Sequence, residues 1–427
     1  MWQGDTFQFS RYGSVSPGFW SPFRRLVAFA ILAAAVPFVM NAQTTPPPAP
    51  EAPDVTVDTG YVDYDKAVSL PLGVGFRIPS YNRVDGVVLP WGPVIMLADG
   101  KLNIDPTVTY RSDIGELDPF LKIQFQIGDR DEIEVHGGRA TFTNDEWIRS
   151  DLINSAAALF VGSDARNYFR ADRAVARYSH RFTRRDWTIL PSIGALTENA
   201  WSTGSAVAHS SAPFSLFGRD DSLKMERPNP SIRRGHLTSG LGRMDLAYER
   251  DLVTFDFDTR LEVAFDSPGT GQPGSITQNA VGEFVQLTFG SKASFPTFGT
   301  QRFAFRGHAV VTPGDIAPPQ RFAYLGGAGT LATVDLLALG GDNLIFVEGE
   351  YSLPLTRPLL PLVGAPILSA RYAAGGAGVG STPDLIQNIG VGIGARLLKA
   401  EYHIDPNYRK TDYSSRNAFS IGVSLAF

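Results

Sequence analysis

The chain ends on the stretch Asn417 to Phe427, NAFSIGVSLAF, in which apolar residues alternate with small or polar ones without a break. This period of two predicts a β-strand with one face suited to hydrocarbon. The residues on that face are Phe419, Ile421, Val423, Leu425 and Phe427. Because the chain stops on the outward aromatic itself, with no polar tail, we interpret the stretch as the closing strand of a membrane barrel rather than a strand of a soluble domain.

From Tyr81 onward the same alternation recurs without a helical period. The clearest case runs from Val253 to Phe265, a length that half-buried soluble strands rarely reach. Segments of this kind lie near residues 83–91, 103–111, 119–128, 131–142, 169–182, 186–199, 235–249, 252–266, 280–295, 299–312, 343–356, 363–374, 386–397, 398–406 and 416–427. These are fifteen segments, and single-chain bacterial barrels have even strand numbers, so we expect one more near 68–78 or 93–99.

The connections between these segments alternate between short and long. Tight turns are predicted at Gly128–Arg130 and Arg250–Asp251, and long connections at 144–168, 200–234 and 313–342. Such an asymmetry is typical of barrels with short periplasmic turns and longer outer loops. We therefore predict an all-β fold, a transmembrane antiparallel β-barrel of about sixteen strands over residues 67–427.

The composition agrees with this class. The 427 residues include 43 Gly, 28 Phe, 14 Tyr and no Cys, and the mean hydropathy is near zero, because lipid-facing and lumen-facing residues cancel in the average. The net charge is -5, and it becomes -7 without residues 1–42, which hold three arginines and one aspartate. A mildly acidic chain lacks the basic face that nucleic acids require, so no nucleic-acid partner is expected.

The N-terminal region resembles an export signal. Arg24 and Arg25 precede the apolar run Leu26 to Met40, which spans about 22 Å as a helix and is too short for a ~30 Å hydrocarbon core. We predict a signal peptide over residues 1–42, with an uncleaved membrane helix as the alternative. Residues 43–66 contain the proline-rich TTPPPAPEAP at 44–53 and are expected to form an extended linker.

The segment Pro318 to Leu355 reads PPQRFAYLGGAGTLATVDLLALGGDNLIFVEGEYSLPL and is similar to part of the BamA-like outer-membrane assembly and translocation barrels, the bacterial surface antigen family. In that family an Arg-Phe-x-Leu-Gly-Gly run precedes the loop, and a Gly-Gly opens a later strand with Glu-Tyr-Arg-x-Pro-Leu. The residues that carry the match here are Arg321–Phe322, Leu325–Gly327, Gly341 and Glu350–Leu355. The resemblance implies that loop 313–342 folds back into the lumen. The loop residues singled out in this way are Arg321, Phe322, Gly326, Gly327, Gly329 and Leu331.

Two departures from that pattern bear on the mechanism. Where the family loop has Leu-Arg-Gly-Tyr, this chain has Leu331 to Val334 without an arginine, and Ala373 stands where the family has the aspartate that binds that arginine. Losing both partners leaves no unpaired charge, and the loop is expected to be held by apolar contacts of Val334, Leu336 and Leu337 or to be mobile. The second departure is that residues 54–80 are too few for a POTRA-type periplasmic domain.

Charged residues with an expected place inside the barrel form two groups. The first is a basic strip, Arg166, Arg170, Arg173, Arg177 and Arg181, continued by Arg184 and Arg185. It either selects anions and binds lipopolysaccharide phosphates or is neutralised by acidic lumen faces such as Asp256, Asp258 and Glu262. The second is a lumen-facing network of Glu348, Glu350, Arg302 and Arg306, in which Glu350 is expected to pair with one of the two arginines.

No catalytic or metal-binding pattern is present. The six histidines have no metal-ligand spacing to one another, and no Gly-x-Ser-x-Gly elbow occurs. We predict no enzymatic activity, no metal and no cofactor. A barrel hydrolase would become relevant only if Ser179 met His180 or His308 at the membrane edge.

The resemblance implies insertion or translocation of protein or lipid at the outer membrane of a Gram-negative bacterium, and a porin-like diffusion pore is the alternative. The expected partners are outer-membrane lipids and lipopolysaccharide, the barrel assembly machinery for the chain's own insertion, and a separate periplasmic partner protein. Neither the client nor lateral opening between the first and last strands follows from the sequence.

Overall fold

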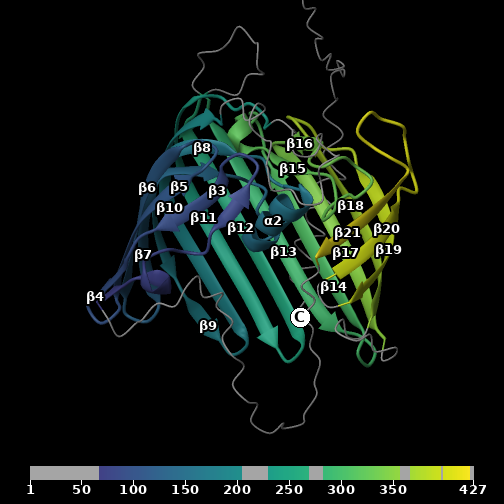
Figure 1. Ribbon diagram of the computed structural model, residues 1–427, viewed down its shortest axis with the longest axis horizontal. Helices are drawn as coiled ribbons and strands as arrows, with labels where there is room; N and C mark the ends of the chain where they lie inside the picture. The colour runs from purple at the N-terminus through teal and green to yellow at the C-terminus, as the bar shows by residue number, and fades with distance from the viewer. Residues whose placement is uncertain (1–66, 204–228, 269–281, 356–365, 396–397, 424–427) are drawn as a thin grey trace, which may run out of the picture. The chain divides into compact units, whose positions relative to one another are not determined.

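Nineteen strand segments of this computed structural model are hydrogen-bonded into one antiparallel sheet (Figure 1). The structure describes residues 67–203, 229–268, 282–355, 366–395 and 398–423. The predicted signal peptide, the predicted linker and the last positions of the closing strand, including Leu425 and Phe427, lie outside these ranges. No helix in the described ranges is long and apolar enough to cross a membrane.

The strands are arranged in chain order, and each pairs with a strand that lies close to it in the chain. Their bounds are β1 Val68–Ser69, β2 Ser80–Asn82, β3 Gly86–Trp91, β4 Val94–Leu97, β5 Leu102–Arg111, β6 Glu116–Ile127, β7 Asp131–Phe142, β8 Phe169–His180, β9 Phe182–Arg184, β10 Trp187–Ser202, β11 Gly235–Arg250, β12 Val253–Asp266, β13 Phe284–Pro296, β14 Arg302–Val311, β17 Asn343–Pro354, β18 Ile367–Gly378, β19 Ile386–Ala395, β20 Leu398–Ile404 and β21 Asn417–Val423. Two short strands outside this sheet, β15 Ala323–Leu325 and β16 Leu339–Gly341, pair with each other.

Three strands of the sheet are interrupted, so the nineteen segments make sixteen strand positions. β3 and β4 both pair with β5, and β8 and β9 both pair with β10. β1 and β2 pair with β4 and β3 respectively, and a bridge from Phe76 to Trp91 joins the gap between them. The prediction of about sixteen strands is therefore confirmed, and residues 68–82 supply the sixteenth.

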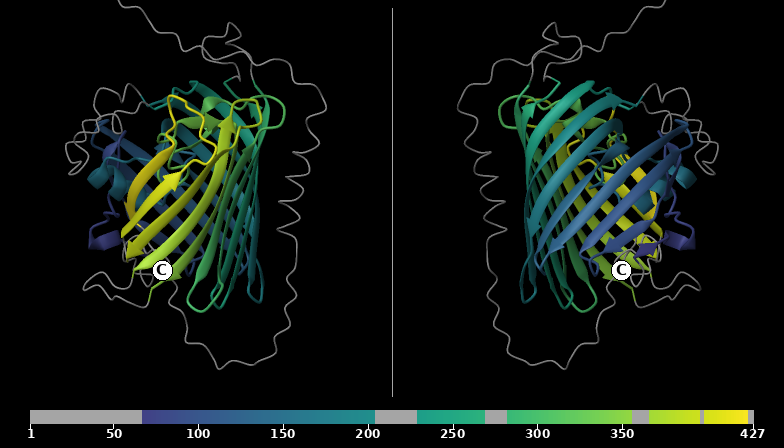
Figure 2. Two further views of the ribbon diagram at one scale, coloured as in Figure 1. Left: turned by 90° about the vertical axis from the view of Figure 1, so that its right-hand side faces the viewer. Right: turned by 90° about the vertical axis from the view of Figure 1, so that its left-hand side faces the viewer.

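The sheet curls into a barrel (Figure 2). The outer face of this barrel is apolar. On β6, for example, Leu117, Leu121 and Phe125 are exposed, whereas Asp118 between them is fully buried. An apolar outer wall around a polar interior inverts the arrangement of a soluble protein and is that of a transmembrane barrel. The predicted outward residues Phe419 and Ile421 of β21 are each 66% exposed.

The two ends of the barrel differ as the sequence indicates. Short turns join β6 to β7, β9 to β10 and β11 to β12 at one end, which we call the short-turn end. Connections of 26 to 31 residues, such as 143–168 and 312–342, lie at the opposite, long-loop end. Aromatic pairs at the short-turn end, such as Trp187 with Tyr248 at 4.6 Å between ring centroids, form part of an interfacial girdle.

The two edges of the sheet are the first strand, β1 with β2, and the last strand, β21. Each of them is paired on one side, β2 with β3 and β21 with β20. Among the described residues no ladder of hydrogen bonds joins β21 to β1 or β2.

Candidate functional site

The connection between β14 and β17 folds back into the lumen. It contains a short 3-10 helix, Pro319–Arg321, and the hairpin of β15 and β16. Its glycines make the tight turn that this path requires, because Gly326, Gly327 and Gly329 all have φ between +81° and +129°. At Gly326 a β-carbon would lie 2.1 Å from the carbonyl oxygen of Asp335, so no other residue fits there.

Arg321 anchors the first limb of this loop to the barrel wall. Its Nε donates to Glu262 Oε2 on β12 at 2.8 Å, and its Nη2 to Glu262 Oε1 at 3.1 Å. Its Nη1 donates to Glu198 Oε1 on β10, also at 3.1 Å. Glu198 is completely buried and also pairs with Arg173 of β8. The loop is thus tied directly to β10 and β12, and through Glu198 to β8, by charged hydrogen bonds, which are the strong kind.

The charge of Arg321 is secure in this position. Burial alone lowers the pKa of a guanidinium, but the adjacent carboxylates of Glu198 and Glu262 outweigh it and raise the pKa of Arg321 above its usual value. The ion pair therefore persists at every pH at which the two carboxylates remain ionised.

A second group of charges holds the tip of the loop. Glu348 of β17 accepts from Arg306 of β14 at 3.1 Å and from Arg371 Nε of β18 at 2.9 Å. The same two arginines also donate to loop carbonyls, Arg306 to Gly329 and Arg371 to Thr330, the latter at 2.8 Å. The carboxylate thus orients two cations whose remaining donors bind the loop backbone.

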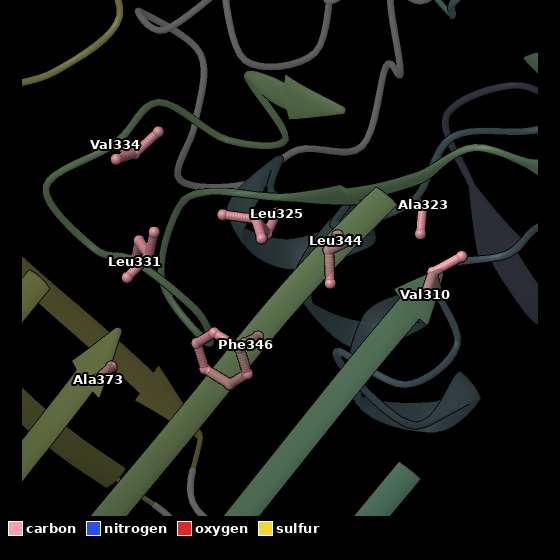
Figure 3. Packing of buried hydrophobic residues seen from close by; sticks show 8 residues of the cluster. All are labelled: Val310, Ala323, Leu325, Leu331, Val334, Leu344, Phe346 and Ala373. Atoms are coloured by element: carbon pink, nitrogen blue, oxygen red, sulfur yellow. The ribbon is translucent and has the colours of Figure 1, made fainter. Parts of the chain in front are cut away.

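Apolar packing completes the attachment of the loop (Figure 3). Ala323, Leu325, Leu331 and Val334 of the loop are buried against Val310, Leu344, Phe346 and Ala373 of the wall. Ala373 is 1% exposed, and it packs in the same cluster as Leu331 and Val334. At the place where the family pattern has an arginine and an aspartate, this chain therefore has an apolar contact.

The expected apolar attachment of the loop is accordingly present. Leu336 and Leu337 pack in a neighbouring cluster with Ile148 of the 143–168 segment. Beside it Thr333 exchanges hydrogen bonds with Asn388 of β19 at 3.1 and 2.8 Å.

A second segment, 143–168, forms the other half of the plug. The indole of Trp147 stacks on His308 of β14 with ring centroids 4.3 Å apart. Asn144 donates to the carbonyls of Gln320 and Phe322 at 2.8 and 3.0 Å, and Arg149 donates to the carbonyl of Ala328 at 2.9 Å. The two segments therefore support each other across the lumen.

Next to this plug lies a cavity of about 540 Å³ whose lining includes both charged and apolar residues. It is lined by Trp147 and Arg321 of the plug and by inward residues of β8 and β10 to β14. A second cavity of about 290 Å³ continues it toward the turns at the short-turn end, and the two share Arg177, Ser192 and Arg243. The described lumen is thus a vestibule that leads from the short-turn end to the plug.

Most of the predicted basic strip is paired with carboxylates. Arg170 bonds to Asp118 at 2.6 Å, Arg173 to Glu198, and Arg177 to Glu134 at 2.8 Å. Arg166 of the 143–168 segment pairs with Asp151 at 2.7 Å. Arg181, Arg184 and Arg185 are exposed near the β9–β10 turn. The arrangement favours internal neutralisation over an anion-selective strip, although the neutralising carboxylates are not those that the sequence suggested.

Glu350 has a different partner from the expected one. It pairs with Lys399 of β20 at 2.7 Å rather than with Arg302 or Arg306. The cause is the register, because Arg306 lies directly opposite Glu348, and Ala304 lies opposite Glu350. Arg302 donates instead to the carbonyl of Leu252 at 3.3 Å.

The described residues show no Ser-His pair of the kind a hydrolase needs. Ser179 is buried on the inward face of β8, whereas the neighbouring His180 binds Asp131 at 2.7 Å. His308 lies in the lumen against Trp147. Nor does any group of three or more His, Asp or Glu in the described ranges have the geometry to hold a metal ion.

Three residues of the site were not identified from the sequence. Glu198 and Trp147 gave only a weak signal, a charge at an inward position of a strand and an aromatic residue in a long loop. Arg371 lies two residues before Ala373 and was not singled out from the sequence. Which strand a loop side chain reaches is a matter of three-dimensional register that periodicity does not reveal.

No family model matches the chain, and no curated protein matches it significantly in sequence. Among solved structures, CdiB from Escherichia coli is 13% identical with a TM-score of 0.45. The matched region covers 81% of this chain and 60% of the CdiB chain. BamA from Haemophilus ducreyi lacking POTRA domains 1-3 is 12% identical with a TM-score of 0.48, covering 81% of this chain and 69% of its own. A bacterial polysaccharide outer membrane secretin is 9% identical with a TM-score of 0.30, covering 82% of this chain and 92% of its own. These similarities concern the barrel architecture and establish no family.

Proposed function

We propose that this protein is a plugged barrel of the outer membrane of a Gram-negative bacterium that inserts or translocates protein or lipid. The observation that carries the proposal is the attachment of the 312–342 loop, whose Arg321 is buried between carboxylates of β10 and β12. A loop attached in this way separates the vestibule from the long-loop end. Passage then requires the loop to move or the wall to part.

The alternative, a porin-like diffusion pore, requires a path that is continuously open to small solutes. A pore loop narrows such a path, whereas here two segments pack against each other over the cavity through Trp147, Asn144 and Arg149. The charged part of the cavity lining, with Arg260 and Lys292 beside Asp256 and Asp258, suits an aqueous vestibule in either case. The plug therefore supports translocation rather than free diffusion of solutes.

Single-channel recording of the purified mature protein in planar bilayers tests the proposal. We expect the intact protein to be closed or to flicker at low conductance, and deletion of residues 322–340 to raise the conductance steeply. Arg250→Met serves as a control. Arg250 is 64% exposed in the β11–β12 turn, which lies at the short-turn end and away from the plug. Steady, wide, ion-selective channels from the intact protein would refute the proposal and favour the diffusion pore.

A further inference from the structure

The edge of β2 that faces away from β3 carries backbone amide groups that need hydrogen-bond acceptors. Tyr81 lies opposite Val87 of β3, and the amide groups of Tyr81 and Arg83 point away from β3. In an antiparallel sheet alternate residues direct their amides to the same side, where a neighbouring strand would accept them. Left bare, such an edge would pair with any extended segment.

In this structure the 143–168 segment supplies the acceptors. The hydroxyl oxygen of Ser155, on helix α2 (Asp151–Ala156), accepts from the Tyr81 amide at 2.6 Å. The Oδ2 atom of Asp164 accepts from the Arg83 amide at 3.0 Å. Two side chains thus occupy the places that carbonyl oxygens of an adjacent strand would take.

Further contacts hold this cap in position. Tyr81 packs against Ala158 of the following helical turn, η2 (Ala157–Val161). The guanidinium of Arg83 lies 3.6 Å from Asp164 and donates to Asn167 Oδ1 at 3.2 Å. Asn154 and Tyr168 both donate to Asp164 Oδ1 at 2.9 Å, which fixes the carboxylate against the edge.

The strand that the cap excludes can be identified from the topology. β2 ends at the long-loop end, where residues 83–85 turn into β3, and β21 begins at the same end after the 405–416 connection. β21 is the opposite edge of the curled sheet and is paired only with β20 among the described residues. At the level of Tyr81 and Arg83, the neighbour in a closed barrel would therefore be β21.

We propose that the 143–168 segment is a removable cap on the edge of β2, and that Ser155 and Asp164 hold β2 and β21 apart at the long-loop end. When the cap leaves, β21 pairs with β2 and the barrel closes. The cap and the closed seam are mutually exclusive because both use the amides of Tyr81 and Arg83. The inference concerns strand pairing and does not depend on what the barrel transports.

Disulfide trapping tests this directly, because the chain contains no cysteine. Ser80 lies on the lumen face of β2, because it pairs with Val88, which in turn pairs with the inward Arg111. Ser80→Cys is therefore combined with a single cysteine at Ala418, Ser420 or Gly422, which alternate along the lumen face of β21. Oxidised protein is scored by its shifted migration on a non-reducing gel. We expect little cross-linking in the capped chain, and about a tenfold rise for at least one pair when Ser155→Ala and Asp164→Ala remove both acceptors.

Three comparisons make the result decisive. Ser155→Ala alone removes one hydroxyl and is expected to give a smaller rise in the same direction. Ser150→Ala is the matched control, because Ser150 lies in the same segment and its side chain makes no capping hydrogen bond. Phe419→Cys lies on the outward face of β21 and should not cross-link to residue 80.

Resistance of the folded barrel to detergent at low temperature shows that each variant has folded. Cross-linking that is equally strong in the capped chain would overturn the proposal, because the cap would then exclude nothing. Cross-linking that is absent from every folded variant would also overturn it, because β21 would not be the strand that replaces the cap.

Discussion

Replacing Arg321 by methionine tests whether this residue fixes the plug. The change keeps an unbranched side chain but removes three charged hydrogen bonds, to Glu262 at 2.8 and 3.1 Å and to Glu198 at 3.1 Å. Removing one partner of a buried ion pair typically costs about 3–5 kcal/mol, because the other charge stays buried without compensation. Glu198 keeps Arg173, and Glu262 is 15% exposed and still accepts from the Ser239 hydroxyl at 2.9 Å.

These remaining contacts put the expected loss at the lower limit, about 3 kcal/mol. A loss of this size shifts the equilibrium between docked and undocked loop about a hundredfold toward undocking. Hydrogen-exchange mass spectrometry of the protein in micelles measures it as faster amide exchange over residues 318–337. Adding Glu262→Gln to Arg321→Met should slow the exchange again, because one unpaired buried charge is removed.

The comparison variant is Arg250→Met, which removes an arginine that is 64% exposed and 3.8 Å from Asp251. It should leave the exchange of the loop unchanged, since exposed ion pairs contribute little. Unchanged exchange in Arg321→Met, or equal acceleration in both variants, would show that Arg321 does not hold the loop.

Two further predictions concern the wall. Phe346→Ala, at the fully buried centre of the contact between loop and wall, should lower the free energy of unfolding in urea by about 3–5 kcal/mol. Phe298→Ala, at a position 76% exposed in the β13–β14 turn, should change it by no more than about 0.5 kcal/mol. Ile193→Arg, on the outer face of β10 and 68% exposed, should destabilise the folded protein in liposomes by about 2–4 kcal/mol. Ser192→Arg, which faces the polar lumen, should cost clearly less, and an equal cost would contradict the assignment of the two faces.

The sequence predicted the sheet well because a period of two assigns each residue to one face. Once Phe255 and Phe257 are taken to face lipid, Asp256, Asp258 and Glu262 must face the lumen, and the cavity lining agrees. The first strand was the uncertain one. It is broken into β1 and β2 by a 3-10 turn at Pro71–Gly73, so its alternation is too short to be distinctive.

The partners inside the lumen were predicted less well. The ion-pair partner of a residue on an adjacent strand depends on the register of the two strands. Arg306 lies opposite Glu348, two residues from Glu350, and Glu350 therefore pairs with Lys399 instead of an arginine. Arg321 and Glu198 are 123 residues apart in the chain. Nothing in the alternation of β10 distinguishes a carboxylate that binds a loop from one that binds its neighbouring strand.

The attachment of the 312–342 loop shows what replaces an ion pair that this chain lacks. Without an arginine beyond Leu331, the loop tip can be apolar, and it packs against Ala373 and Phe346. Apolar contacts alone are non-directional and would not specify where the first limb of the loop lies. Arg321 provides the direction, since a guanidinium satisfied by two separate carboxylates fits only one position. The apolar cluster takes in both limbs of the loop, and Arg306 and Arg371 add charged hydrogen bonds at its tip. Releasing the loop therefore requires the ion pairs of Arg321, these tip contacts and the apolar cluster to separate together.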